Sequence, residues 1–225
     1  FRNPEKIFKD TNTPLLFASE SDWTDCNVCK PDTSIKKEYD FIYICLKVDD
    51  KKEVCDDWAT YNKNWTLAKK CLDIFCNKYK LKGLLVGRKG CKLPAGCKYL
   101  ETTNMIKYHE LTKMYNKSRF IFVPNEKDAS PRVLTEALAM NIPCFVNKNI
   151  LGGWKYVTDE TGEFFTDEND VSNSLDILLD KIKNKQYEPR NYFVTNYSVI
   201  NAGKKLKKFL YDNFSERINI KENLV

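Results

Sequence analysis

The chain has 225 residues, of which 42% are hydrophobic and 30% charged, as in ordinary globular proteins. It contains no run of about 18 apolar residues, so we expect no transmembrane helix. Lysine and arginine exceed acidic residues by 37 to 31, a net charge of +6. Because only six of the 37 are arginine and no basic-aromatic motif occurs, we expect no nucleic-acid partner.

The first 38 residues form an irregular segment, interrupted by Pro4, Pro14 and Pro31. Residues 15–18 are apolar and could form a short strand. The chain starts at Phe1, without a Met or a signal-peptide hydrophobic region. We therefore expect residues 1–38 to be a lead-in or linker that packs on a domain formed by residues 39–225. We also expect this domain to be excised from a longer protein.

From residue 39 onward the sequence alternates between strand and helix signals. Apolar runs predict strands, most of them buried on both faces, at residues 41–46, 81–86, 120–123, 144–146 and 163–165. Helical spacing of apolar residues predicts helices at residues 65–75, 109–117, 133–140, 171–183 and 201–214. This alternation is typical of an α/β fold with a Rossmann-like, doubly wound parallel sheet. In such sheets ligands bind at the carboxyl ends of the strands.

Nine cysteines are present, an odd number with irregular spacing. Cys26 and Cys29 have zinc-knuckle spacing, but the gap between Cys91 and Cys97 is poor for a second ligand pair. We interpret all nine as reduced thiols in a cytoplasmic protein. The Lys- and Asn-rich composition fits a protist or a large DNA virus. For a viral protein, the expected location is the cytoplasm of the infected host cell.

The strongest local signal is residues 125–143, where a buried strand leads through a polar loop into a helix. Ser130 suits the N-cap of this helix and Pro131 its first turn. The amides of that turn would favour a phosphate or diphosphate at the carboxyl end of the sheet. Asp128 and Glu136 flank the turn, and carboxylates accept hydrogen bonds from sugar hydroxyls. A plain capped helix with solvated acids remains the alternative.

The same segment resembles the signature of retaining glycosyltransferases of the GT-B fold, in the glycogen-synthase-like family four. That signature has a Glu, a seven-residue spacer and Glu-Ala-Met-Ala, followed by Gly-x-Pro and a strand. Here Asp128 replaces the first Glu, and residues 136–143 match the second half. Further matches in the same order are Ile106, Glu110-Leu111, Tyr115, Gly152-Gly153 and Gly162-Glu163-Phe164. The resemblance covers residues 39–214 and implies the C-terminal half of a GT-B enzyme.

The resemblance implies a role for each matched position. Glu136 would bind the ribose hydroxyls of a nucleotide, and Asp128 would face the donor sugar. Ile106 would contact the base through its backbone. The family also places an Arg or Lys just after the first strand and a Lys at the start of the next helix, for which Lys47 and Lys63 are the nearest candidates. Arg88, directly after the second strand, is a further basic candidate near the base or phosphate. The predicted catalytic residues are Asp128, Glu136 and Lys63. The predicted substrate-binding residues are Lys47, Arg88, Ile106, Ser130, Pro131, Arg132, Val133, Leu134, Gly152 and Gly153.

The implied activity is sugar transfer, with retention, from a nucleoside-diphosphate sugar to a glycan or glycoprotein acceptor, with UDP as the expected nucleotide. Lysines and helix amides would stabilise the leaving diphosphate, so we expect no metal and no cofactor. Catalytic residues of the other GT-B half are absent, so we expect further domains of the parent chain as partners. The Lys-rich residues 204–210 would also suit an anionic membrane surface. The alternatives are a sugar-nucleotide epimerase and a non-catalytic nucleotide-binding or scaffold module.

Overall fold

The computed structural model describes residues 7–9, 11–47, 55 and 61–216. Its core is a six-stranded sheet in which every pair of neighbouring strands is parallel, in the order β3-β2-β1-β4-β5-β6. The strands are β1 (Tyr39–Ile44), β2 (Gly83–Val86), β3 (Leu100–Thr103), β4 (Ser118–Val123), β5 (Cys144–Asn147) and β6 (Gly162–Phe165). The predicted Rossmann-like parallel sheet is confirmed.

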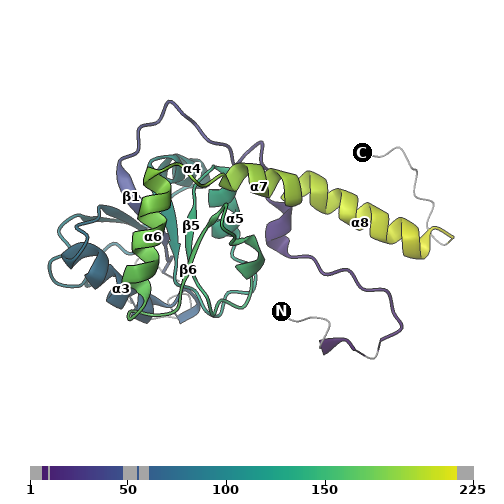
Figure 1. Ribbon diagram of the computed structural model, residues 1–225, viewed down its shortest axis with the longest axis horizontal. Coiled ribbons are helices and arrows are strands. Elements are labelled where there is room, and N and C mark those ends of the chain that lie inside the picture. Colours follow the sequence, from purple (N-terminus) through teal and green to yellow (C-terminus); the bar gives the residue numbers. More distant parts are fainter. Residues whose placement is uncertain (1–6, 10, 48–54, 56–60, 217–225) are drawn as a thin grey trace.

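Helices cover both faces of this sheet (Figure 1). Side chains alternate between the faces along each strand, so Phe41 and Tyr43 lie in one core layer and Ile42 and Ile44 in the other. The aromatic layer is covered by α3 (Trp65–Asn77) and α6 (Val171–Lys183). The other layer is covered by α4 (Tyr108–Asn116), α5 (Arg132–Ala139) and α7 (Pro189–Asn196).

One strand and one α-helix were not predicted, and one possible strand does not form among the described residues. The edge strand β3 has the sequence Leu-Glu-Thr-Thr and is partly exposed, so it carries no apolar run. The short helix α7 buries only Pro189 and Phe193, too few residues for a periodic signal. Residues 15–18 have no regular secondary structure and pair with no described strand. Edge position and short length therefore explain the two omissions.

Two terminal segments lie on the same side of the sheet (Figure 1). The N-terminal segment contains the 3-10 helix η1 (Glu20–Trp23), and the last helix of the described residues is the long α8 (Ser198–Phe214). They meet where the Val199 amide donates to the Thr24 carbonyl, at 3.1 Å. The distal part of α8 projects away from the body of the domain. Within the described part of the chain, none of the helices has the length and apolar character that crossing a membrane requires.

Four of the nine cysteines form disulfides, Cys55–Cys91 and Cys76–Cys97. The prediction of nine reduced thiols is therefore wrong for these four, and the cytoplasmic location loses the support that it drew from them. A zinc site with Cys91 and Cys97 as its second pair is also excluded, because the two residues belong to different disulfides. Sequence spacing gave no signal of this pairing, since the partners are 36 and 21 residues apart.

Candidate functional site

The predicted site residues come from loops that leave the carboxyl ends of neighbouring strands. Lys47 and Lys63 follow β1, and Asp128 follows the adjacent strand β4. Gly152 and Gly153 follow β5, which lies next to β4. Because all strands run in the same direction, these loops meet at one edge of the sheet. The fold thus brings together residues that lie up to about a hundred positions apart.

Asp128 is the centre of a polar cluster at this edge. Its Oδ2 atom lies 2.5 Å from the Lys63 ammonium and accepts a hydrogen bond of 2.9 Å from the Asn125 side chain. Its Oδ1 atom accepts the Ser130 amide at 3.2 Å. The residue as a whole is 8% exposed. The carboxylate is therefore held in one orientation by three donors, one of them a cation.

The backbone of Lys63 is positioned by residues around the start of α3. The hydroxyl of Tyr43, a buried residue of β1, donates to the Lys63 carbonyl at 3.0 Å. The next residue, Asn64, has a left-handed backbone and caps α3 by accepting the Leu67 amide. The cap and the tyrosine hydroxyl together fix the backbone from which the lysine side chain reaches Asp128. The sequence indicated a lysine at this helix start, but not its carboxylate partner.

Lys47 and Arg88, the other two predicted cations, are engaged by the backbone of nearby loops. The Lys47 ammonium donates to the Lys89 carbonyl at 3.0 Å, and Lys47 is 9% exposed. Arg88 is fully buried, with its guanidinium 5.3 Å from the centre of the Trp65 ring. Its Nη1 donates to the Cys55 carbonyl. Arg88 thus lies buried between two loops, and its predicted contact with a ligand stays a prediction.

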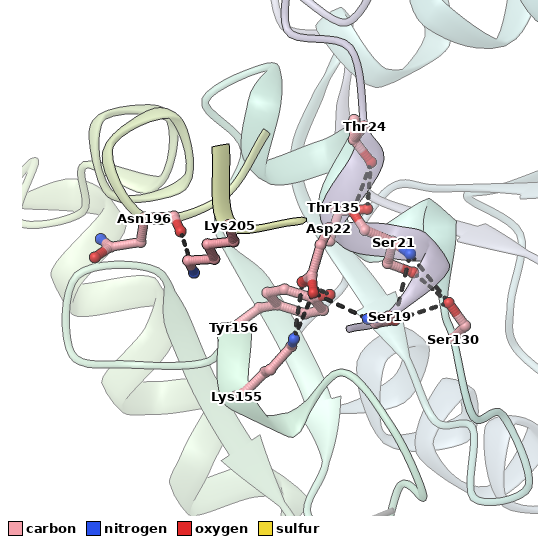
Figure 2. Close-up of polar contacts among 10 residues, drawn as sticks. All are labelled: Ser19, Ser21, Asp22, Thr24, Ser130, Thr135, Lys155, Tyr156, Asn196 and Lys205. Atoms are coloured by element: carbon pink, nitrogen blue, oxygen red, sulfur yellow. Dashed lines mark hydrogen bonds and ion pairs between the residues drawn. The ribbon is translucent and has the colours of Figure 1, made fainter. Parts of the chain in front are cut away.

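Ser130 does not cap α5 as predicted; Pro131 occupies the N-cap position, without a side-chain cap. The Ser130 hydroxyl instead meets the N-terminal segment, as Figure 2 shows. It lies 2.9 Å from the Ser19 hydroxyl and 2.8 Å from the Ser21 hydroxyl, and it accepts the Ser21 amide at 3.1 Å. The Ser130 hydroxyl therefore binds the N-terminal segment. The donors that remain near the start of α5 are the backbone amides.

The amides predicted to bind a diphosphate are partly used within the turn itself. The Arg132 amide donates to the Ser130 carbonyl at 2.9 Å, and the Leu134 amide donates to the Pro131 carbonyl at 3.0 Å. The side chain of Arg132 is exposed and pairs with Glu20 at 3.4 Å, while Val133 is half-buried and packs on the core. The helix dipole still favours an anion here.

Gly152 and Gly153 pack directly against the loop that carries Asp128. The Gly152 amide donates to the Asp128 carbonyl at 2.9 Å. A Cβ atom on Gly152 would lie 1.8 Å from the Ala129 carbonyl oxygen, an impossible distance. Gly153 has a φ of 81°, and a Cβ there would meet the Pro131 ring at 2.5 Å. The pair of glycines is therefore required by close packing of two loops of the site.

Glu136 lies on α5 and is half-buried. Its Oε2 atom accepts a hydrogen bond of 3.1 Å from the hydroxyl of Tyr115, which is fully buried on α4. Burial raises the pKa of the Glu136 carboxyl, while the Tyr115 hydrogen bond, the Arg132 charge and Tyr108 lower it to a smaller extent. Among the described residues, no ion pair to Glu136 is found. The fold thus keeps an acid where its charged form is costly.

We expect Glu136→Gln to stabilise the ligand-free domain at neutral pH, by about 1 kcal/mol, because the amide removes a costly buried charge. The sign follows from linkage: an acid whose pKa is raised by folding lowers stability as pH rises above its ordinary value of 4.5. The advantage of the variant should therefore vanish when thermal unfolding is measured below pH 4.

The matched control is Glu163→Gln, because the Glu163 carboxylate is paired with Lys181 at 2.6 Å and accepts the Tyr187 hydroxyl at 2.8 Å. That variant should lose stability at pH 7. Equal effects of the two substitutions would contradict the assignment of Glu136 as a costly buried acid.

Ile106 lies in the loop between β3 and α4 and packs against the core layer that contains α5. Two residues later, Tyr108 begins α4 and interacts with Glu136. The Tyr108 hydroxyl lies 3.0 Å from the buried Cys29 thiol, whose pKa burial raises to about 11. The loop of Ile106 thus lies beside the predicted ribose-binding acid. Tyr108 was not among the predicted site residues, because a single tyrosine outside any motif does not indicate a site.

The N-terminal segment, which the sequence predicted to pack on the domain, is part of this region. Asp22 of η1 is buried and accepts hydrogen bonds from the Tyr156 hydroxyl at 2.6 Å and the Lys155 ammonium at 2.9 Å (Figure 2). Thr24 lies 2.8 Å from the Thr135 hydroxyl of α5. The segment therefore links α5 to the turn that follows the two glycines. Ser19 and Asp22 cap this 3-10 turn with a reciprocal capping box.

A separate hollow of about 700 Å³ opens on the surface between α3 and residues 92–95. It is lined by Lys69, Lys70, Asp73, Ile74, Lys92, Leu93, Pro94, Ala95 and Glu168. None of these residues belongs to the predicted site. The candidate site is therefore identified by its side chains and their contacts, and not by this cavity.

No protein-family model matches the sequence, and no curated protein matches it. Solved structures do match its fold. The C-terminal domain of the glycosyl transferase group 1 family protein LpcC from Francisella tularensis is 15% identical, with a TM-score of 0.55. That match covers 77% of this chain and 96% of the other.

Two further matches are longer enzymes. A glycosyltransferase from Rickettsia africae is 14% identical with a TM-score of 0.61, over 84% of this chain and 55% of that one. The pneumococcal O-GlcNAc transferase GtfA is 10% identical with a TM-score of 0.59, over 94% and 43%. This chain therefore spans about half the length of the longer structures that it matches. The chain has the fold of the C-terminal domain of GT-B group 1 glycosyltransferases.

Proposed function

We propose that this domain binds a nucleoside-diphosphate sugar at the carboxyl edge of its sheet and supplies the donor half of a retaining glycosyltransferase. The observation that carries the proposal is the pair of acids, Asp128 and Glu136, that flanks the start of α5 with Lys63 held 2.5 Å from Asp128. A cation for phosphate and two acceptors for hydroxyls are the groups that such a ligand needs.

In this proposal each site residue contacts a different part of the nucleotide sugar. Glu136 accepts the ribose hydroxyls, the backbone near Ile106 contacts the base, and Asp128 accepts a hydroxyl of the donor sugar. Lys63 and Lys47 face the diphosphate. An ammonium group has three donors, so Lys63 can bond a phosphate oxygen while it keeps Asp128. The Gly152-Gly153 turn holds the Asp128 loop in place through the contact described above.

In the proposed reaction the bond between the anomeric carbon and the diphosphate breaks, and the sugar passes with retention to a hydroxyl of a glycan or glycoprotein acceptor. Negative charge develops on the leaving diphosphate, where fixed cations and the helix dipole stabilise it without reorganisation. No metal and no cofactor enter this scheme. The acceptor side belongs to a further domain of a longer parent chain.

UDP is the nucleotide that we propose first. The pneumococcal transferase with the same fold was solved in complex with UDP and GlcNAc. A sugar-nucleotide epimerase would use the same donor contacts but would need no acceptor. A non-catalytic module would bind the nucleotide without turnover. Transfer or hydrolysis of a nucleotide sugar, first by this chain and then in the presence of the missing half, distinguishes these three functions.

The test of binding is a thermal-shift series with UDP, GDP, ADP, CMP and TDP, each with and without EDTA. A ligand at 100 times its Kd adds about 2.7 kcal/mol of stability, which raises the Tm of a domain of this size by about 5–11 °C. We expect one nucleotide to give this shift and EDTA to leave it unchanged. A shift that EDTA abolishes and Mn²⁺ restores would contradict the role of the lysines, and no shift with any nucleotide would contradict the proposal.

A further inference from the structure

The hydroxyl of Tyr115 is directed at Glu136, the proposed ribose-binding acid. Tyr115 is fully buried on α4, and its hydroxyl donates to Oε2 of Glu136 at 3.1 Å. The Val133 carbonyl is a second acceptor for the same hydroxyl, at 3.3 Å. A buried tyrosine hydroxyl normally finds one partner; this one is directed at an acid that we assign to ligand binding.

The other groups that face Glu136 provide weaker support. Arg132, on the same helix, is exposed to solvent and paired with Glu20. Tyr108 on α4 lowers the pKa of Glu136 only slightly, and its hydroxyl lies 3.0 Å from the Cys29 thiol of the N-terminal segment. Cys29 carries no charge at neutral pH, because its pKa lies at about 11. Tyr115 is thus the one of these groups that is both fully buried and directed at a carboxylate oxygen.

We propose that Tyr115 is a positioning residue for nucleotide binding: it fixes one oxygen of Glu136, so that the remaining lone pairs accept two ribose hydroxyls. This inference rests on the proposed function. An ionised carboxylate accepts at both oxygens, whereas a protonated one uses one oxygen as a donor. Glu136 can therefore bind both hydroxyls at once only while it is ionised.

The protonation of Glu136 supports the same conclusion. Burial raises the pKa of this carboxyl, and the hydrogen bond from Tyr115 is the largest of the effects that lower it. Removing the hydroxyl should therefore raise the pKa further. Nucleotide affinity should fall as pH drops through this pKa, and the fall should begin at a higher pH when the hydroxyl is missing.

The test is Tyr115→Phe, with UDP and 2′,3′-dideoxy-UDP as probes in isothermal titration calorimetry from pH 5 to pH 8. We expect UDP to bind about tenfold more weakly at pH 7, because the hydrogen bond is made to a charged group. Dideoxy-UDP lacks both ribose hydroxyls, so its affinity should be the same for the wild type and the variant. The midpoint of the pH dependence for UDP should move to higher pH.

The matched control is Tyr187→Phe, since the Tyr187 hydroxyl also donates to a carboxylate, that of Glu163, at 2.8 Å and outside the site. It should leave both affinities unchanged. A ¹³C NMR titration of Glu136 in the ligand-free domain should show the raised pKa directly, with no nucleotide present.

Two results would overturn the inference. One is an equal loss for UDP and dideoxy-UDP, which would mean that Tyr115 acts only on the general packing of the site. The other is an unchanged Glu136 titration in the Tyr115→Phe variant. A wild type that binds no nucleotide in the thermal-shift series would instead refute the proposed function and the inference together.

Discussion

Gly152→Ala should destabilise the domain by roughly 3 kcal/mol, because the new methyl group would overlap backbone that cannot move independently. The Cβ atom would lie 1.8 Å from the Ala129 carbonyl oxygen and 3.0 Å from its Cα. The clash would also break the 2.9 Å hydrogen bond from the Gly152 amide to the Asp128 carbonyl. Thermal unfolding should show a Tm about 6–12 °C lower, and binding of a nucleotide sugar should weaken because the Asp128 loop is displaced.

Gly203→Ala is the matched control for this substitution. Gly203 lies inside α8, and a Cβ there has no neighbouring atom within 4 Å. In a helix, Ala is favoured over Gly by about 0.5–1 kcal/mol, so the control should raise the Tm slightly. A Gly152→Ala variant with wild-type Tm and wild-type binding would contradict the close packing of the two loops.

Asp128→Asn should lower transfer or hydrolysis of the nucleotide sugar by about 100-fold, a loss typical of removing one preorganised polar contact from a transition state. Free UDP should bind as before or slightly more tightly, since Lys63 is then released from its 2.5 Å ion pair and remains available to the diphosphate. The amide keeps the size of the side chain, and its oxygen can still accept the Ser130 amide. The Asn125 amide, which donates to Oδ2 of Asp128, then has to rotate and present its oxygen to the new NH2 group. The loop should therefore keep its conformation.

The measurement is a pair of titrations, with UDP and with the intact nucleotide sugar, on the wild type and the variant, followed by turnover. Glu126→Gln, in the same loop and half-buried, is the control acid and should change neither affinity. Equal losses for UDP and the nucleotide sugar would place Asp128 at the phosphates or in the structural framework. No loss for either ligand would leave it a structural partner of Lys63.

The sequence by itself determined the class of fold and the position of the site along the chain. Apolar runs such as residues 41–46 and 120–123 predict strands buried on both faces, and only a sheet covered by helices on both sides satisfies them. The structure confirms β1 and β4 at these places, side by side and parallel. The spacing of Asp128 and Glu136 around a helix start was equally visible, because the two acids are separated only by a short loop and the first turn of α5.

Tertiary structure decided which partners those residues have. Lys63 meets Asp128 across 65 positions, and Ser130 meets Ser19 and Ser21 across more than a hundred. Arg88 follows a strand just as Lys47 does, yet it is buried over Trp65. The pairings of Cys55 with Cys91 and of Cys76 with Cys97 were likewise invisible. Periodicity reports which face of an element is buried, whereas partners are chosen by the packing of distant segments, and a local pattern carries no information about that packing.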